Sequence, residues 1–292
     1  MKYTLFLGCN IQSRTPQYQT AAQAVCKLLD IELIQRQEFI CCGYPMRNIN
    51  ESSSLLSAAK NLAIAEQNQH TLMVLCKCCY GNLKIAQYLL GNNPSIQTKI
   101  NRILAKEGLT YKGTANIKHF LSVLHEDVGL KTLKNRIKIK YNNLKIAASV
   151  GCHALRPAKI TKFDTPAAPT LFDDLVKVTG AKSIEWSRKS DCCGAALLGV
   201  NDQLSKDIMN KKLLNAKEAG ANFISVACPY SFLQFDTFQA GVANGNGAYQ
   251  TLGPVLYPQL LGLTMGIDKT VLGIDRQQID ISSLESYLKA ED

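Results

Sequence analysis

The chain of 292 residues lacks any long hydrophobic run and any recognisable export signal. No apolar stretch approaches the roughly 18 to 20 residues that a membrane-spanning helix needs. The segment Met1-Lys2-Tyr3 leads directly into a strand-like run, with no small-residue cleavage site. Hydrophobic residues make up 46% of the chain, which is enough for an ordinary core. We therefore expect a globular, cytoplasmic protein with no membrane span.

Negative charge is absent from one long segment. The net charge is +10, and the stretch from Lys131 to Lys145 contains no acidic residue. Aromatic residues are not interleaved with this charge and no nucleic-acid motif accompanies it, so nucleic-acid binding is not expected. The stretch is either a solvated connection or a docking surface for an acidic partner or an anionic substrate.

Cysteine is abundant, and its spacing shows an internal duplication. The first copy consists of Cys9, Cys41-Cys42-Gly43, Cys76, Cys78 and Cys79, and the second of Cys152, Cys192-Cys193-Gly194 and Cys228, with Ser231 in the place of Cys79. The two copies are offset by 143 to 152 residues. Such repetition must be recognised before the fold is interpreted.

Eleven cysteines in a chain without an export signal do not suggest a disulfide framework. Thiols stay reduced in the cytoplasm and serve there as metal ligands or nucleophiles. Adjacent cysteine pairs are awkward for a single tetrahedral zinc ion, which usually takes four ligands from short C-x2-C elements. The pattern therefore favours iron–sulfur clusters, with structural zinc and plain buried cysteines as the alternatives.

The hydrophobic pattern alternates between strands and helices in both copies. In the first half, strands are expected at Tyr3–Leu7, Ile31–Ile34 and Leu72–Leu75, and helices at Thr15–Leu29 and Ser52–Gln69; in the second, strands are expected at Leu144–Val150 and Phe223–Ala227, and helices at Ala168–Thr179 and Gln203–Ala219. This alternation predicts an α/β fold with short parallel sheets flanked by helices. We expect two duplicated halves, residues 1–143 and 144–292, related by a pseudo-twofold axis.

The cysteines follow predicted strands. Ligands of open α/β sheets bind at the carboxyl ends of the strands. Cys9 and Cys76 should therefore converge with the first cysteine pair, and Cys152 and Cys228 with the second. Cys26 lies within an apolar helical segment, where a cysteine packs as a small hydrophobic residue.

The double C…C-C-G…C-x-x-C pattern resembles the cysteine-rich CCG domain family. Within that family the chain is most similar to the B subunit of heterodisulfide reductase and of its sulfur-oxidising relatives. The segments that carry the resemblance are Cys41-Cys42-Gly43-Tyr44-Pro45, Cys228-Pro229-Tyr230, Phe232 to Asp236, and Pro254 to Gly266. The resemblance runs the length of the chain and implies two CCG-type α/β halves.

The resemblance implies one iron–sulfur cluster in each half, of an unusual noncubane [4Fe-4S] type held by five cysteines. It assigns Cys9, Cys41, Cys42, Cys76 and Cys79 to the first cluster, with Cys78 as an additional thiol nearby, and Cys152, Cys192, Cys193 and Cys228 to the second. Ser231 stands where the fifth cysteine of the second site would be. Because a serine oxygen is a harder and less acidic ligand, it would bind weakly, leave an iron open, or accompany an ordinary cubane cluster.

The resemblance also implies an activity, that of an oxidoreductase acting on sulfur groups. A disulfide, persulfide or thiol would react between the clusters, with catalytic roles for His153, Cys192 and Cys193. The alternative role for His153 is to order the backbone beside the cluster. The implied partners are a ferredoxin-like C subunit, a flavin-containing A subunit and, in sulfur-oxidising relatives, an acidic lipoate-bearing carrier protein.

A second class of function stays open at this point. The chain would then be an electron-relay or anchoring subunit, like the CCG-containing partners of succinate, lactate or glycolate dehydrogenases. Many fused relay subunits carry a ferredoxin-type C-x2-C-x2-C-x3-C-P run, which this sequence lacks. A separate partner would therefore have to carry the electrons, which favours the catalytic subunit.

Overall fold

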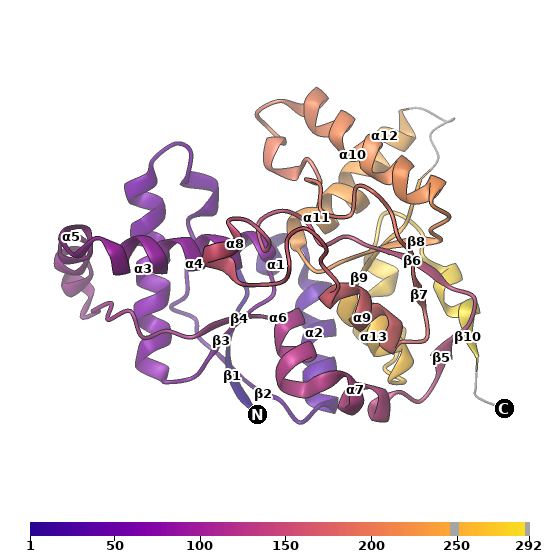
Figure 1. Ribbon diagram of the computed structural model, residues 1–292, viewed down its shortest axis with the longest axis horizontal. Helices are drawn as coiled ribbons and strands as arrows, with labels where there is room; N and C mark the ends of the chain where they lie inside the picture. The colour runs from indigo at the N-terminus through magenta and orange to yellow at the C-terminus, as the bar shows by residue number, and fades with distance from the viewer. Residues whose placement is uncertain (246–250, 290–292) are drawn as a thin grey trace.

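A computed structural model describes residues 1–245 and 251–289 and contains two four-stranded parallel sheets (Figure 1). The sheets have the strand orders β2-β1-β3-β4 and β7-β6-β8-β9. Their strands are β1 (Lys2–Phe6), β2 (Glu32–Gln35), β3 (Leu72–Val74), β4 (Ile117–His119), β6 (Lys145–Ala148), β7 (Lys182–Ser183), β8 (Phe223–Val226) and β9 (Pro254–Leu256). The identical order confirms the predicted α/β fold with a duplicated parallel sheet.

The strands are parallel because each is followed by a helical connection that returns the chain to the same edge. In the first sheet Leu5 pairs with Met73, and in the second Ala147 pairs with Ile224. Strands β3 and β8 are buried along their whole length, as expected for parallel strands covered on both faces.

Helices cover both sheets. The longer ones are α1 (Gly8–Arg14), α2 (Pro16–Leu28), α3 (Glu51–Asn68), α4 (Lys77–Asn92), α5 (Pro94–Leu104), α7 (Leu130–Arg136), α9 (Leu171–Val178), α10 (Asp202–Glu218), α12 (Gln239–Asn244) and α13 (Tyr257–Thr264), and the short ones are α6 (Phe120–Ser122), α8 (Ala158–Thr161), α11 (Pro229–Leu233) and α14 (Lys269–Leu272). None of the helices within the described residues has the length and apolar character of a membrane span.

Local signals repeat between the halves as well. The side chain of Asn50 accepts a hydrogen bond from the Ser53 amide at 2.9 Å, and the side chain of Asn201 accepts one from the Leu204 amide at 3.0 Å. Each asparagine caps the first turn of the long helix that follows a cysteine pair, α3 or α10. The duplication therefore extends to the start signals of individual helices.

The two halves are packed tightly against each other. Helix α2 of the first half contacts α13 and α14 of the second, α4 contacts α8, and α7 contacts α9. Near the chain's C-terminal end, β10 (Leu288–Lys289) pairs antiparallel with β5 (Lys140–Tyr141). The boundary between residues 143 and 144 stays a prediction, since β5 lies before it and its partner lies at the far end of the second half.

One detail differs from the sequence-based expectations. The helix expected at Ala168–Thr179 begins only at Leu171, after a turn in which Asp164 accepts a hydrogen bond from the Leu171 amide. The basic stretch forms most of α7 and then β5. It lies by the amino end of β6, whereas Cys152 follows the carboxyl end of that strand. In Figure 1, α7 accordingly lies near the N-terminus, away from α1, α8 and α11.

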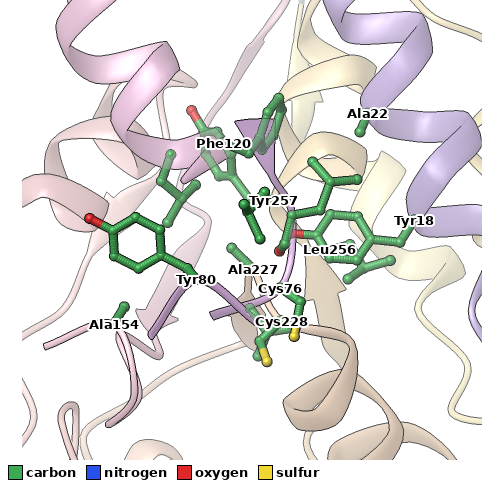
Figure 2. Close-up of a cluster of buried hydrophobic side chains, with 14 of the residues drawn as sticks. Tyr18, Ala22, Cys76, Tyr80, Phe120, Ala154, Ala227, Cys228, Leu256 and Tyr257 are labelled. Atoms are coloured by element: carbon green, nitrogen blue, oxygen red, sulfur yellow. The ribbon is translucent and has the colours of Figure 1, made fainter. Parts of the chain in front are cut away.

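The core joins both halves beneath the cysteines. Tyr18 of α2 donates a hydrogen bond to the Leu75 carbonyl at 2.8 Å and is fully buried. Figure 2 shows Tyr18 close to Leu256 and Tyr257 of the second half, with Cys76 and Cys228 side by side at the edge of this cluster. The core thereby fixes the relative position of the two central strands, β3 and β8, from which these cysteines follow.

Candidate metal centre

Each cysteine pair lies in a tight loop that only glycine can complete. Gly43 and Gly194 have φ angles of +87° and +89°, in the left-handed region that favours glycine. A Cβ atom on Gly43 would lie 2.5 Å from the Ser54 carbonyl oxygen, and one on Gly194 would lie 2.5 Å from the Ser205 carbonyl oxygen. The glycine of each C-C-G element therefore lets its loop pack closely on the following long helix, which positions the cysteine sulfurs.

The first group of sulfurs comprises all five cysteines predicted for it. The Sγ atoms of Cys41 and Cys9 lie 3.7 Å apart, and Cys41 also contacts Cys42. Cys42 in turn contacts Cys79, which contacts Cys76. Cys76 caps helix α4, since its sulfur accepts a hydrogen bond from the Cys79 amide. One continuous group of five thiols thus forms at the carboxyl edge of the first sheet.

The second group repeats this arrangement with one substitution. Cys192 contacts Cys152 and Cys193, and the hydroxyl of Ser231 is within hydrogen-bonding distance of Cys193. This last contact is the counterpart of the one between Cys42 and Cys79. Serine therefore takes the spatial place of the missing cysteine, as its sequence position predicts.

The two groups meet at the middle of the molecule. The Sγ atoms of Cys76, Cys78 and Cys228 all lie within 4.8 Å of one another, and all three residues are buried. Figure 2 shows the sulfurs of Cys76 and Cys228 next to each other where their strands end. The duplication therefore brings the two sites into contact through residues that follow the central strands β3 and β8.

His153 lies between the sites. Its Nδ1 atom is 3.2 Å from the Cys152 sulfur and 3.6 Å from the Cys78 sulfur, and its Nε2 atom is 3.0 Å from the Tyr44 hydroxyl. Burial raises the pKa of Tyr44, so its hydroxyl keeps its proton and is suited to donate to Nε2. In that arrangement the Nδ1–H faces the sulfurs. His153 therefore links the Tyr44 hydroxyl of the first half to the Cys152 sulfur of the second half and to the Cys78 sulfur.

Neighbouring sulfurs polarise the thiols within each group. Hydrogen bonds from Cys42 and Cys9 lower the pKa of Cys41 well below that of an ordinary thiol, and those from Cys152 and Cys193 do the same for Cys192. The same contacts raise the pKa values of Cys9 and Cys152. Within each pair, the first cysteine is therefore the one most readily deprotonated. Because the thiolate is the form that binds metals, that cysteine is the best prepared of the pair to act as a ligand.

Two buried lysines, not foreseen from the sequence, lie close to the second group. Lys77 donates to the Ser149 carbonyl at 2.9 Å, and its ammonium lies 4.8 Å from the centre of the Phe172 ring. Lys212 packs over Trp186, 5.1 Å from the ring centre. Burial lowers the pKa of each lysine to about 8, although the nearby cysteines act in the opposite direction. These cations are placed to balance the charge of several thiolates.

Lys212 also holds the loop before the second cysteine pair. Its ammonium donates to the carbonyls of Arg188, Lys189 and Asp191 at 2.9, 3.3 and 2.7 Å. Asn61, at the equivalent position of the first half, donates to the Cys41 carbonyl at 3.1 Å. A role for Lys77 near the site could have been predicted from the sequence, because it directly follows Cys76. Lys212 lies in the middle of α10, where nothing in the sequence indicates such a role.

Replacing Lys212 by methionine should destabilise this loop, because one buried and two partly buried carbonyls lose their donor. We expect the midpoint of thermal unfolding to fall by about 4–10 °C and the iron content to decrease. Thermal unfolding and iron analysis of anaerobically purified protein measure both effects. The matched control is Lys211→Met, since Lys211 is exposed in the same helix. Equal behaviour of the two variants would show that the three carbonyl contacts do not support the site.

An open cleft of about 890 Å³ borders the first group. Asn10 and Tyr230 belong both to its lining and to the lining of the narrow cavity that contains Cys9, Cys42, Cys76 and Cys79. Arg14 and Lys206 contribute positive charge to the cleft and Asp202 one negative charge, and Leu233 and Phe238 contribute apolar surface. Cys9 is the exposed cysteine of the eleven. A ligand in this cleft would therefore reach the first site past Asn10 and Tyr230.

The donor set fits iron–sulfur clusters better than zinc. Five thiols form one contiguous group, whereas a structural zinc ion takes four ligands. Thiolates are the usual ligands of iron–sulfur clusters, and adjacent thiolates can bind neighbouring irons. The predicted first-group residues are all brought together, and Cys26 is buried in α2.

Comparison with known proteins agrees with this assignment. The family described as "Cysteine-rich domain" (CCG) matches residues 3–84 and 146–236. The chain is 32% identical, over 95% of its length and 94% of the relative's, to the B subunit of the ferredoxin/F420H2-dependent CoB-CoM heterodisulfide reductase of Methanosarcina acetivorans. It is 29% identical, over 97% and 99%, to the 8-methylmenaquinol:fumarate reductase membrane anchor subunit of Wolinella succinogenes.

A solved structure shares the fold. A hypothetical protein from Helicobacter pylori matches with a TM-score of 0.72 and 17% identity, over 96% of this chain and 52% of that one. The repeated cysteine groups and the two matched segments occupy equivalent places in the two sheets. The chain therefore belongs to the cysteine-rich CCG domain family, and its relatives include the B subunit of heterodisulfide reductase.

Proposed function

We propose that this chain is the iron–sulfur catalytic subunit of a heterodisulfide reductase-like complex in sulfur metabolism. It would cleave or form a sulfur–sulfur bond, in a disulfide or between a persulfide and a thiol. The observation that carries this proposal is the meeting of two equivalent sulfur groups at Cys76 and Cys228. A sulfur–sulfur bond has two ends, and two adjoining sites offer one site for each.

The first group would hold a noncubane [4Fe-4S] cluster, and the second group a [4Fe-4S] cluster whose fifth position departs from the cysteine pattern. Such clusters, when bound by these cysteines, would supply electrons one at a time. Reduction of a disulfide takes two electrons and two protons and yields two thiols, so a proton path is also needed. His153 and Tyr44 provide one, because they connect the half-buried hydroxyl of Tyr44 to the sulfurs of Cys152 and Cys78.

The cleft beside Asn10 suggests how the substrate approaches. Arg14 and Lys206 suit a substrate or carrier arm that bears an anionic group, and the apolar lining suits its alkyl portion. The basic stretch around Lys138 lies at the opposite edge of the second sheet, so an acidic partner bound there would not deliver the reacting sulfur. An acidic lipoate-bearing carrier would instead have to present its arm at the cleft.

Electrons must come from other subunits. We propose a ferredoxin-like C subunit and a flavin-containing A subunit as the partners, by analogy with the heterodisulfide reductase relatives. The alternative function is an electron-relay or anchoring subunit of a dehydrogenase-type complex. The similarity to a fumarate reductase anchor subunit over nearly the whole chain favours that alternative. The two functions differ in whether a thiol or disulfide reacts at this chain.

The test is iron and acid-labile sulfide analysis of anaerobically purified protein, joined to EPR of the oxidised state with and without a thiol. We expect about eight irons per chain and a thiol-sensitive signal. The paired variant Cys192→Ser/Cys193→Ser should retain about four irons and lose the sulfur–sulfur activity. Cys26→Ser is the matched control, since Cys26 is buried away from both groups.

Two results would contradict the proposal in different ways. About four irons with zinc at the second site would exclude the two-cluster mechanism. Two clusters without any response to thiols or disulfides would leave the clusters in place and move the chain to the relay or anchoring class.

A further inference from the structure

Cys78 belongs to neither five-position pattern. By the duplication, Cys76 corresponds to Cys228, Cys79 to Ser231, and Cys78 to Tyr230. The second site therefore lacks a fifth thiol at the position where the first site has Cys79. The first half carries one thiol more than its own site uses, and the structure shows where that thiol lies.

The side chain of Cys78 reaches the second site from the first turn of α4. Its sulfur lies within 4.8 Å of the Cys228 sulfur. It also lies 3.6 Å from Nδ1 of His153, the atom that is 3.2 Å from the Cys152 sulfur. The Cys78 sulfur thus lies next to the Cys228 sulfur. It is linked to the Cys152 sulfur through Nδ1 of His153, which lies close to both.

The packing of α4 holds Cys78 in this position. One turn after Cys78, Gly81 lies so close to the second half that an added Cβ would be 2.4 Å from the His153 carbonyl oxygen. Tyr80 donates a hydrogen bond to the Thr161 carbonyl, which also belongs to the second half. The first turns of α4 are therefore part of the wall of the second site.

Ser231 has a different contact. Its hydroxyl lies within hydrogen-bonding distance of the Cys193 sulfur, and its side chain is buried. A hydroxyl that donates to a thiolate stabilises it without needing to be deprotonated, whereas an alkoxide ligand would require the loss of a far less acidic proton. Hydrogen bonding to Cys193 is therefore the role that suits Ser231.

We propose that Cys78 is the fifth thiolate ligand of the second iron–sulfur cluster, supplied across the duplication by the first half. This inference rests on the proposed presence of two clusters. It gives each cluster five thiolates: the first takes Cys9, Cys41, Cys42, Cys76 and Cys79, and the second takes Cys78, Cys152, Cys192, Cys193 and Cys228. The second cluster then ties the two halves of the chain together.

The test isolates each site by removing the other. In the full chain, Cys41→Ser/Cys42→Ser should leave about four irons, those of the second cluster. Adding Cys78→Ser to that background should reduce iron and sulfide to below about one per chain. In the Cys192→Ser/Cys193→Ser background, adding Cys78→Ser should leave the remaining irons in place. Cys26→Ser, added to each background, is the control for losing a buried thiol elsewhere.

A rescue variant keeps the result interpretable if Cys78→Ser weakens the fold. Ser231→Cys, added to the variant that lacks Cys41, Cys42 and Cys78, should restore the second cluster, with circular dichroism reporting the folded content of each protein. EPR and Mössbauer spectra identify which cluster is present without any activity measurement.

Two results would overturn the proposal. Retention of the second cluster with unchanged spectra after Cys78→Ser would show that Cys78 is not its ligand. Loss of one zinc ion per chain on Cys78→Ser, with iron unchanged, would assign Cys76, Cys78 and Cys228 to a separate mononuclear site. A wild-type protein without iron and sulfide would instead contradict the proposed function itself, so the two failures are distinguishable.

Discussion

Replacing His153 by glutamine should lower the rate of sulfur–sulfur bond reduction by about 100- to 10,000-fold, the usual range for losing a positioned proton donor. Glutamine preserves a hydrogen-bonding group of similar size but cannot pass a proton from one nitrogen to another. His153 joins the Tyr44 hydroxyl at 3.0 Å to the Cys152 sulfur at 3.2 Å. Turnover with a disulfide substrate and an artificial electron donor measures the effect.

The same experiment separates proton transfer from a structural role. If His153 carries protons, His153→Gln should keep its iron and sulfide content while turnover falls, and Tyr44→Phe should show a smaller loss. The control is His70→Gln, since His70 lies just before the amino end of β3, at the opposite edge of the first sheet. Loss of iron in His153→Gln would assign the histidine to organising the site, and undiminished turnover would remove it from the reaction.

Much of the fold was predictable because the signals are local. Strand β3 is a short run of apolar residues, and α3 and α10 begin at equivalent asparagine caps. The C-C-G elements predict tight loops, and the glycine after each cysteine pair indeed adopts a positive φ angle. The first sulfur group was likewise predictable, because its cysteines follow strands of one sheet whose carboxyl ends share an edge.

The other features of the site depend on tertiary packing, chiefly between the two halves, and no local sequence pattern encodes that packing. Helix α4 starts immediately after Cys76, and its polar first turn, with Lys77 and Cys78, does not look buried in the sequence although both residues are. The reason is tertiary: these side chains enter the second half, where Lys77 finds the Ser149 carbonyl and Cys78 finds His153. Lys212 is buried by packing within the second half, where its three carbonyl acceptors lie more than 20 residues earlier in the chain, so no local pattern reveals it either.

This dependence on packing between the halves leads to a second large expected effect, at Gly81. Its position is buried against the second half, and a Cβ atom there would lie 2.4 Å from the His153 carbonyl oxygen and 3.2 Å from the carbonyl carbon. Because both atoms belong to the backbone, no side-chain rotation relieves the overlap. Gly81→Ala must therefore push the Cys152–His153 segment away from α4.

We expect Gly81→Ala to reduce stability by about 1–3 kcal/mol, as overpacking of a dense interior does. The larger effect should be on the second cluster: with Cys41→Ser/Cys42→Ser in the background, Gly81→Ala should lose most of the remaining iron. Iron and sulfide analysis in that background, with thermal unfolding of the otherwise wild-type chain, measures both quantities. The effect on iron follows because Cys152 is displaced from its partners while Cys78 stays on α4.

The same helix provides the matched control. Gly91 is exposed in the last turn of α4, and an added Cβ there meets no atom within 4 Å. Gly91→Ala should therefore raise stability by about 0.5–1 kcal/mol, the usual gain in helix propensity, and leave the iron content unchanged. If Gly81→Ala behaved in the same way, α4 would not be held against the His153 segment, and the close contact between the halves would not be what positions the second site.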